Sequence, residues 1–467
     1  MRVTDMTHGR PIRLILLFSL PLMLGSVFQQ LYTIVDTIII GRGVGMQALA
    51  SIGAADWINW LVLWGLQGFT QGFAILAAQE FGAGAYDRLR RVLAMIVKLS
   101  CWFGIAVTII SLLLVRPLLT LLHTDPAVFG GAQTYLYVQF GGSLIIIAYN
   151  MAAAVLRCLG DSKTPLLAII AASFANIALD LLFVMGFGWG IFGASFATVL
   201  AQLIAFLLCL RSLRRLPFVQ LTKADWKTDP AILLHLCRLG IPTGLQMSMI
   251  TLGGMVLQSV LNGFGVVFVA GYTAANKLYG ILESASVAFG YAMTAYMGQN
   301  RGARNAARID TGIRAVLALS AGFTAAIVTA MLLAGKPLLG LFLSTEEAGA
   351  ADALAVAHRY LMVLMAFLLA LFVLQAYRSS LQGLGEMTVP TLSGFAEMLM
   401  RMGAALVLPA FIGQSGRIFL RRAQAWVCAA ARQSGMVLYA DWENQAGYAE
   451  ITKVLDRLRR STVVISG

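Results

Sequence analysis

Charged residues are scarce in this chain of 467 residues. Asp, Glu, Lys and Arg together make up 12% of it, hydrophobic residues make up 59%, and the mean hydropathy is +0.81. A soluble protein carries roughly a quarter charged residues. So little polar surface cannot cover a chain of this length in water, which excludes a soluble globular protein. The composition predicts an all-α integral membrane protein, whose spanning helices each use about 20 apolar residues.

Histidine and cysteine are also rare. The four histidines (His8, His123, His235 and His358) lie near loops or the ends of apolar runs and lack the spacing of metal ligands. The five cysteines lie far apart and form no CxxC pair, so they indicate neither a zinc site nor a disulfide framework. No Ser-His-Asp arrangement is evident. We therefore expect neither an enzyme nor a bound cofactor.

Acidic residues are fewer than basic ones, 21 against 34, and the formal net charge is +13. In a soluble protein this excess would suggest nucleic acid as a partner. Here the basic residues lie in short connections between apolar runs. Lys and Arg accumulate in the cytoplasmic loops of membrane proteins. The positive charge therefore indicates topology, with the lipid bilayer as partner and no nucleic acid.

Apolar runs of spanning length follow one another along the chain. The first has no evident cleavage site, so we interpret it as a retained span rather than a signal peptide. The pattern predicts about twelve transmembrane helices. The runs fall at roughly 12–40, 47–76, 93–114, 133–155, 166–186, 190–210, 231–261, 266–297, 313–334, 357–383 and 390–412, with a weaker one at 416–438.

The connections between these runs predict the orientation. The even-numbered connections carry clusters of basic residues, such as Arg88 to Arg91 and Arg301 to Arg308. The odd-numbered ones are poorer, and those around Trp189 and Phe264 carry no charge. By the positive-inside rule, the even connections and both termini face the cytoplasm. We expect a multi-pass protein of the plasma or inner membrane.

Several motifs occur twice, in the same order and at an offset of 220 to 225 residues. About six spans per half return the chain to the same side, so the halves share one orientation. We therefore predict two pseudo-symmetric six-helix lobes, 1–210 and 231–440, with a cytoplasmic linker at 211–230 and a cytoplasmic tail at 441–467. The paired motifs are SLP and GIP, LASIGAADWINWL and VAGYTAANKLYGI, AQEFGAG and MGQNRGA, RPLL and KPLL, and LRCLGDSKTP and LQGLGEMTVP.

Ionisable residues inside a span are functional candidates, because each costs free energy in the bilayer. Asp36 lies late in the first span, while Asn176 and Asp180 lie on one face of the fifth. Asp36 and Asp180 each follow a proline, Pro21 and Pro165, by 15 residues, so both should reach the outer half of the membrane and meet. Two neighbouring buried carboxylates can bind a proton near neutral pH, or Na+ through oxygen ligands. The alternative for Asp36 is a cap at the end of its span.

The second half carries other ionisable residues. Glu397 and Arg401 lie four positions apart in the eleventh span, which is typical of an internal ion pair, although Glu397 could instead face a substrate cavity with Arg401 keeping it ionised. Glu283 in the eighth span is a candidate acid for a cationic substrate. Trp60, in a stripe of tryptophans, serves either as an interfacial anchor or as a cation–π wall. We interpret Asp56, near the start of the second span, as structural.

Five segments resemble the MATE family of multidrug and toxic compound extrusion transporters, and the resemblance covers about residues 10–412. They are LPLMLGSVFQQLYTIVDTIIIGR, AQEFGAG, LRCLGDSKTP, FANIALD and LQGLGEMTVP. This resemblance implies a monomeric antiporter that exports small organic compounds, often cationic drugs, in exchange for H+ or Na+, by rocking of its two lobes. It also implies that Asp36, Asn176 and Asp180 form the coupling-ion site and that the first span bends at Pro21.

The sequence departs from the family pattern in two places. Some members carry acidic coupling residues in the seventh and tenth spans, but here the seventh span has no carboxylate and the tenth has Tyr377 and Arg378. In addition, the weak run at 416–438 is interrupted by arginines, and the tail after it resembles a soluble amphipathic helix.

A related function remains open as an alternative. A flippase for a lipid-linked precursor has a similar two-lobe plan, and it would need a cationic central cavity for a pyrophosphate group. Basic residues inside the predicted spans are few, which favours the exporter. They are Lys98, Lys277, Arg378 and Arg401.

Overall fold

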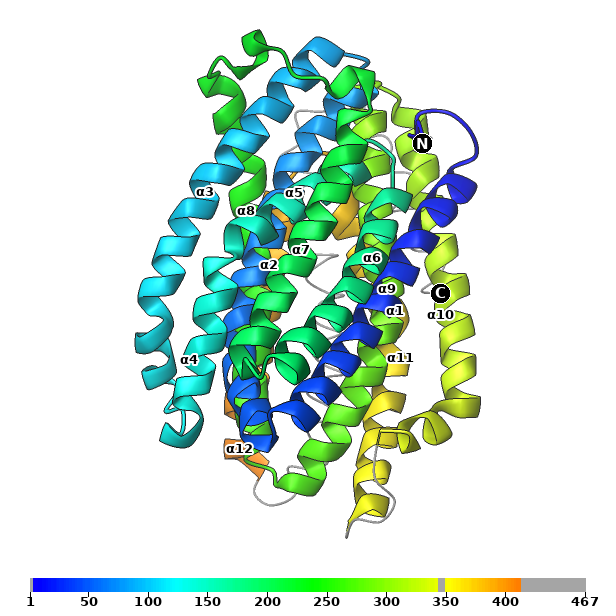
Figure 1. The fold of residues 1–467 in the computed structure, drawn as a ribbon. Helices are drawn as coiled ribbons and strands as arrows, with labels where there is room; N and C mark the ends of the chain where they lie inside the picture. Colours follow the sequence, from blue (N-terminus) through cyan, green and yellow to red (C-terminus); the bar gives the residue numbers. More distant parts are fainter. Residues whose placement is uncertain (1–2, 343–348, 413–467) are drawn as a thin grey trace, which may run out of the picture. The chain divides into compact units, whose positions relative to one another are not determined.

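The computed structural model describes residues 3–342 and 349–412, and within these ranges it is helical throughout, without a strand. The prediction of an all-α fold is confirmed (Figure 1). The helices are α1 (Pro11–Gly43), α2 (Met46–Gly82), α3 (Tyr86–Leu121), α4 (Pro126–Gly141), α5 (Ser143–Cys158), α6 (Lys163–Asp180), η1 (Leu181–Gly186), α7 (Gly190–Arg214), η2 (Pro217–Val219), η3 (Lys223–Trp226), α8 (Pro230–Asn262), α9 (Val266–Gly302), α10 (Ala306–Gly340), α11 (Ala350–Gly383) and α12 (Thr388–Ile412).

Most of these helices are membrane spans by length and composition. Among the described residues, eight helical segments are long and apolar enough to cross a bilayer, and α4 with α5, bent by 50°, makes a ninth when the pair is counted as one span. The bent pair contains the predicted fourth span. Helices α9 and α12 coincide with the eighth and eleventh predicted spans. The twelfth predicted span and the tail lie outside the described residues.

Local chemistry explains where several helices begin. Asp125 accepts a hydrogen bond from the Ala127 N–H at 2.8 Å, and Pro126 fills the first position of α4, where no N–H is needed. Asp229 and Pro230 begin α8 in the same way. Asn305 caps α10 by accepting from the Arg308 N–H at 3.2 Å. These acid–proline and amide caps start each helix in the connection that follows the preceding apolar run.

The chain divides into two compact units, each described here by itself. Unit 1 comprises Met1–Asp5 and Leu20–Ser248, and unit 2 comprises Met6–Ser19 and the residues from Met249 onward. The divisions therefore fall inside α1, beside Pro21, and inside α8. The predicted lobe boundaries at 210 and 231, which follow the connections between spans, stay a prediction.

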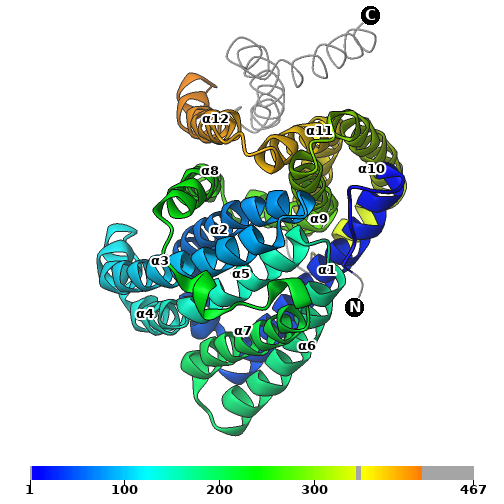
Figure 2. The same cartoon turned by 90° about the horizontal axis from the view of Figure 1, so that it is seen from above.

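In unit 1, α2 packs against α3, α4 and α5, and α7 packs against α4, α5 and α6 (Figure 2). One apolar cluster joins α2, α3 and α4 around Ile58, Val115 and Phe140. Another joins the end of α1 to α2, η1 and α7 around Ile40 and Val184. This second cluster brings the last turns of α1 next to α6, which positions the candidate site.

In unit 2, α9 packs along α11, and both contact α10, while α12 lies against α11 (Figure 2). The segment before α1 is anchored in the same unit by Arg308. Its guanidinium donates to the backbone carbonyls of Met6 at 3.0 Å and Gly9 at 2.9 Å, and to the Asn300 amide oxygen at 3.0 Å. These bonds hold the first turns of α1 on unit 2.

Candidate functional site

The acids predicted in the first half lie together inside unit 1. Asn176 is 1% exposed and Asp180 fully buried, both on α6, and Asp36 is half-buried on α1. The carboxyl groups of Asp36 and Asp180 lie close enough to interact electrostatically, and both also act on the Tyr32 hydroxyl one turn earlier in α1. Asp36 lies more than a hundred positions before Asn176 and Asp180 in the sequence, and the packing of α1 on α6 brings the three residues together.

The polar atoms of this cluster lack hydrogen-bond partners within the described part of the chain. They are one carboxylate oxygen of Asp36, both carboxylate oxygens of Asp180, and the amide oxygen and nitrogen of Asn176. A buried polar group without a partner costs about 1–3 kcal/mol, more when charged. Such a group in a folded protein calls for an explanation, such as water, an ion or a functional role. The geometry thus provides acceptor oxygens that a proton or a hard cation can use.

The backbone changes character at this point of α6. Directly after Asp180 the helix continues as the π-helical turn η1, Leu181–Gly186. Single π-helical turns inside membrane and soluble helices occur frequently at functional sites. The wider turn lies beside the last turns of α1, because Val184 packs in one apolar cluster with Ile39 and Ile40.

Three further polar residues belong to this region. Asp56 of α2 is half-buried and interacts electrostatically with Asp36. Asn59, one turn later on the same helix, donates a hydrogen bond of 3.2 Å to the Tyr135 hydroxyl of α4. That hydroxyl is also affected by the charges of Asp36 and Asp56. Sequence reasoning treated Asp56 as structural and did not single out Tyr135, although the spacing of Asp56 and Asn59 on one helix face was a usable signal.

Unit 2 contains a related contact, with the tyrosine at the position equivalent to Tyr135 and the amide at the position equivalent to Asp56, one turn from Asn59. The Tyr360 hydroxyl of α11 donates to the Asn276 amide oxygen of α9 at 3.2 Å. Tyr360 follows Tyr135 by 225 residues and Asn276 follows Asp56 by 220, the two offsets of the paired motifs. In each unit, therefore, a tyrosine hydroxyl is hydrogen-bonded to an asparagine amide on the polar face of a neighbouring helix, which is α2 in unit 1 and α9 in unit 2. Unit 1 differs by having a carboxylate where unit 2 has an amide.

The ionisable residues of the second half form a charged cluster. Glu397 of α12 is 7% exposed and accepts from two arginines, from Arg401 at 2.5 Å and from Arg378 of α11 at 3.1 Å. Arg378 also donates to the Ser393 hydroxyl at 3.1 Å. Glu283 of α9 interacts electrostatically with both Arg401 and Glu397. The i, i+4 pair expected from the sequence is present. Arg378, noted in the sequence only as a basic residue within a span, is a second partner of Glu397.

The remaining candidate residues have simpler surroundings. Pro21 lies inside α1, which continues through it as one helix. Trp60 is 46% exposed on α2 and forms an edge-to-face pair with Trp57, with ring centroids 5.5 Å apart. Trp60 belongs to unit 1, whereas Glu283, Glu397 and Arg401 belong to unit 2. In the described ranges, no three His, Cys, Asp or Glu side chains gather as a metal site.

Comparison with known proteins places the chain in one family. The family model MatE matches residues 21–182 and 242–407, so one match covers each half and they begin at Pro21 and Pro242. The probable multidrug resistance protein YpnP of Bacillus subtilis is 33% identical over 77% of this chain and 80% of that protein. YoeA, of the same kind and organism, is 27% identical over 84% and 86%.

Solved structures share the fold of this chain. A crystal structure of MATE in complex with MaL6 superimposes with a TM-score of 0.84 at 24% identity, and the match covers 94% of this chain and 99% of that one. The likeness shows that the two-lobe fold is shared. The multi-pass helical architecture, the paired family matches and the common fold lead to one conclusion: this chain belongs to the MATE family of membrane transporters.

Proposed function

We propose that the protein is a secondary active antiporter of the plasma membrane that exports small organic compounds, often cationic drugs, in exchange for H+ or Na+. The observation that supports this most is the group of buried, unpartnered polar atoms on Asp36, Asn176 and Asp180. The names of the relatives, probable multidrug resistance proteins, favour drugs as cargo. Because the candidate ion site lies within one chain, a monomer is sufficient for the exchange.

In this proposal the carboxylate pair carries the coupling ion. Two negative charges close together in a low-dielectric surrounding repel each other, so binding one proton or one Na+ lowers the free energy of the buried site. Asn176 supplies a neutral oxygen beside Asp180. Binding or release of the ion changes the charge next to α1, and Pro21, which removes one backbone hydrogen bond, lets that helix bend in response.

For the cargo we propose contacts with Glu283, Glu397, Arg401 and Trp60. Glu397 is already shared by two arginines, so Glu283 is the carboxylate better suited to attract an organic cation. Within unit 1, the face of Trp60 is the candidate for cation–π contact with a cationic substrate. The flippase alternative needs free positive charge for a pyrophosphate. Arg378 and Arg401 share Glu397 and Arg401 also faces the charge of Glu283, so no specific observation favours that function.

The test is efflux under controlled gradients. In a drug-sensitive bacterial host, the protein should lower the accumulation of ethidium-like dyes while an ion gradient is present. In proteoliposomes, a proton gradient and a sodium gradient are then imposed one at a time, with the other clamped. Dye movement with only one gradient identifies the ion. Unchanged accumulation over a broad panel of cations, with the protein confirmed in the membrane, would contradict multidrug export.

A further inference from the structure

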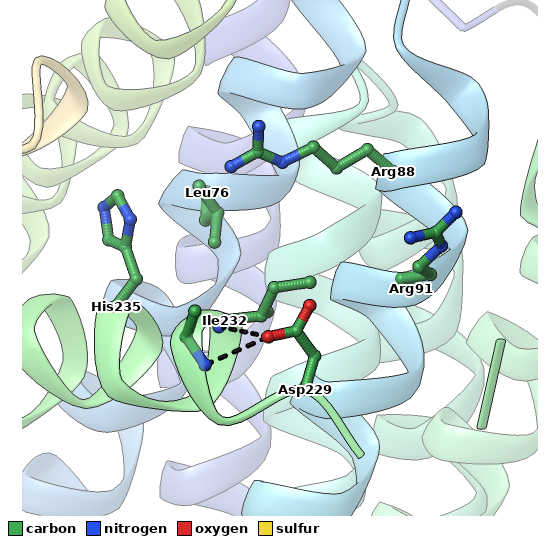
Figure 3. A pocket seen from close by; sticks show the side chains of 7 residues that line it. Leu76, Arg88, Arg91, Asp229, Ile232 and His235 are labelled. Atoms are coloured by element: carbon green, nitrogen blue, oxygen red, sulfur yellow. Dashed lines mark hydrogen bonds between the residues drawn. The ribbon is translucent and has the colours of Figure 1, made fainter. Parts of the chain in front are cut away.

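A cavity of about 380 Å³ lies in unit 1 where α2 ends and α3 and α8 begin (Figure 3). It is separate from the acidic cluster, and nothing in the proposed transport cycle uses it. Arg88, Arg91 and His235 carry cationic or hydrogen-donating side chains, while Leu76 and Ile232 add apolar side chains to the lining. Its lining residues are Leu76, Arg88, Arg91, Asp229, Ala231, Ile232 and His235.

The positive groups of this cavity are only partly neutralised. The Arg88 guanidinium pairs with Glu80 at 3.0 Å along one edge, and its side chain stays 62% exposed. A guanidinium has five N–H donors, so Arg88 can bind a second acceptor. Arg91 is exposed and has no carboxylate within ion-pair distance in the described part of the chain. His235 of α8 adds a further ring nitrogen on the opposite wall (Figure 3).

The acid in the cavity does not offset this charge by pairing with the arginines. Asp229 accepts the backbone N–H groups of Ala231 at 3.0 Å and Ile232 at 3.2 Å, and so caps α8 (Figure 3). The surroundings are cationic as well. The pKa of the Asp225 carboxyl lies below its usual range. Burial acts to raise this pKa, but the hydrogen bonds from Thr222 and the charges of Arg90 and Arg91 lower it by more.

The position of the cavity favours a ligand that is partly apolar. Phe81, Tyr86 and Phe218 form an aromatic cluster at the same end of α2 and α3, with ring centroids 5.5 to 6.3 Å apart. Trp226, nearby in sequence to Asp229, is 40% exposed. Aromatic residues gather at the membrane–water boundary, and basic pockets between spans bind the headgroups of anionic lipids.

We propose that this cavity, with Arg88, Arg91 and His235 as donors, binds a phosphate ester, as carried by the headgroup of an anionic phospholipid or by a soluble phosphate. The two arginines bind the phosphate oxygens through charge-assisted hydrogen bonds. Leu76 and Ile232 contact the first carbons of the glycerol or acyl part. Bound there, the ligand bridges α3 and the start of α8.

Native mass spectrometry of the purified full-length protein tests this, with phosphatidylglycerol, phosphatidylcholine, sn-glycerol 3-phosphate and inorganic phosphate as separate probes. We expect phosphatidylglycerol to bind and phosphatidylcholine to bind much less. Arg91→Gln should weaken phosphatidylglycerol at least about tenfold, the order expected for a lost charge-assisted bond. Arg116→Gln, an exposed arginine elsewhere on α3, is the matched control and should bind as the wild type does.

Each outcome decides the proposal. Binding of glycerol 3-phosphate or phosphate as tight as that of the lipid, with the same dependence on Arg91, supports the site and makes its ligand soluble. Equal lipid binding by the wild type, Arg91→Gln and Arg88→Gln/Arg91→Gln overturns the proposal. Thermal unfolding without added ligand checks that the variants fold. Because the experiment measures binding alone, failure of dye transport does not affect it.

Discussion

At the scale of single residues, the two halves use buried charge differently. In unit 2, the buried carboxylate of Glu397 has two arginine partners. Removing one member of a buried ion pair is destabilising, because it leaves a buried charge without its partner. In unit 1, Asp36 and Asp180 have no arginine or lysine partner in the described structure and face each other instead. The first arrangement is typical of structure, and the second is typical of a site that exchanges a cation.

This contrast predicts opposite outcomes for two conservative substitutions. Asp36→Asn should abolish gradient-driven dye export while the protein remains abundant in the membrane, because a buried charge that is already disfavoured can be removed without unfolding. Glu397→Gln should lower abundance, because losing one partner of a buried ion pair costs about 3–5 kcal/mol. Immunoblots of membranes and dye accumulation measure the two effects. An active Asp36→Asn with a stable, inactive Glu397→Gln would move the coupling site to unit 2.

Asp56 allows a finer test at the same scale. Asp56→Asn gives unit 1 the amide that unit 2 has at position 276, so we expect the fold to be kept. Removing this negative charge removes repulsion from Asp36, so for H+ as the coupling ion Asp36 holds the proton less tightly. The pH at which transport declines should then shift downward. Transport measured over a pH series checks this, and Asp352→Asn, which alters an acid in the first turn of α11, should leave the profile unchanged.

At the scale of helices, glycine decides how closely α2 and α8 approach within unit 1. A Cβ atom at Gly72 would lie 2.5 Å from the Gly240 Cα and 2.6 Å from the Leu239 carbonyl oxygen. Gly68 meets Thr243 and Gly244 in the same way one turn earlier. Small residues let helix backbones touch in membranes, where apolar lipid competes with larger side chains for contact. The close crossing of α2 and α8 therefore requires glycine at positions 68 and 72, because any larger side chain would clash with the backbone of α8.

The helix pair gives a matched stability prediction. Gly72→Ala should lower thermal stability, since overpacking costs about 1–3 kcal/mol. Gly53→Ala, on the same helix, meets nothing within 4 Å and should be neutral or slightly stabilising, because Ala favours the helix over Gly. Fluorescence-detected size-exclusion chromatography after heating compares the two variants. An equal loss in both would show that the α2–α8 contact is not limiting.

At the scale of the whole molecule, the connections predict how the chain is oriented in the membrane. Basic residues crowd the start of α3 and the ends of α7 and α9, whereas the connection between α8 and α9 carries none. In a background with the native cysteines replaced, Asn262→Cys should react with an impermeant maleimide on intact cells. Arg215→Cys, exposed in the linker after α7, should react only after permeabilisation. The reverse labelling pattern would overturn the prediction of cytoplasmic termini.

Run length, charge and internal repetition were sufficient to predict an all-α membrane protein with two related halves, and resemblance was sufficient to predict the family. These properties are local or periodic: an apolar run of about 20 residues can satisfy its backbone in lipid only as a helix. The α4–α5 bend was not evident, because the run at 133–155 stays apolar across Gly141 and Gly142. Composition records whether a segment can span, but not the angle at which two halves of a span meet.

Contacts between distant residues were decided by tertiary packing. The sequence placed Glu397 and Arg401 one turn apart, which is enough to predict their pair. It held no signal that Arg378, 19 positions earlier on another helix, would bind the same carboxylate. The hydrogen bond from Asn59 to Tyr135 spans 76 positions and depends on how α2 rotates against α4. Helical periodicity specifies neighbours along one face, whereas the partner across the interface follows from which side chains can fill the space between two helices.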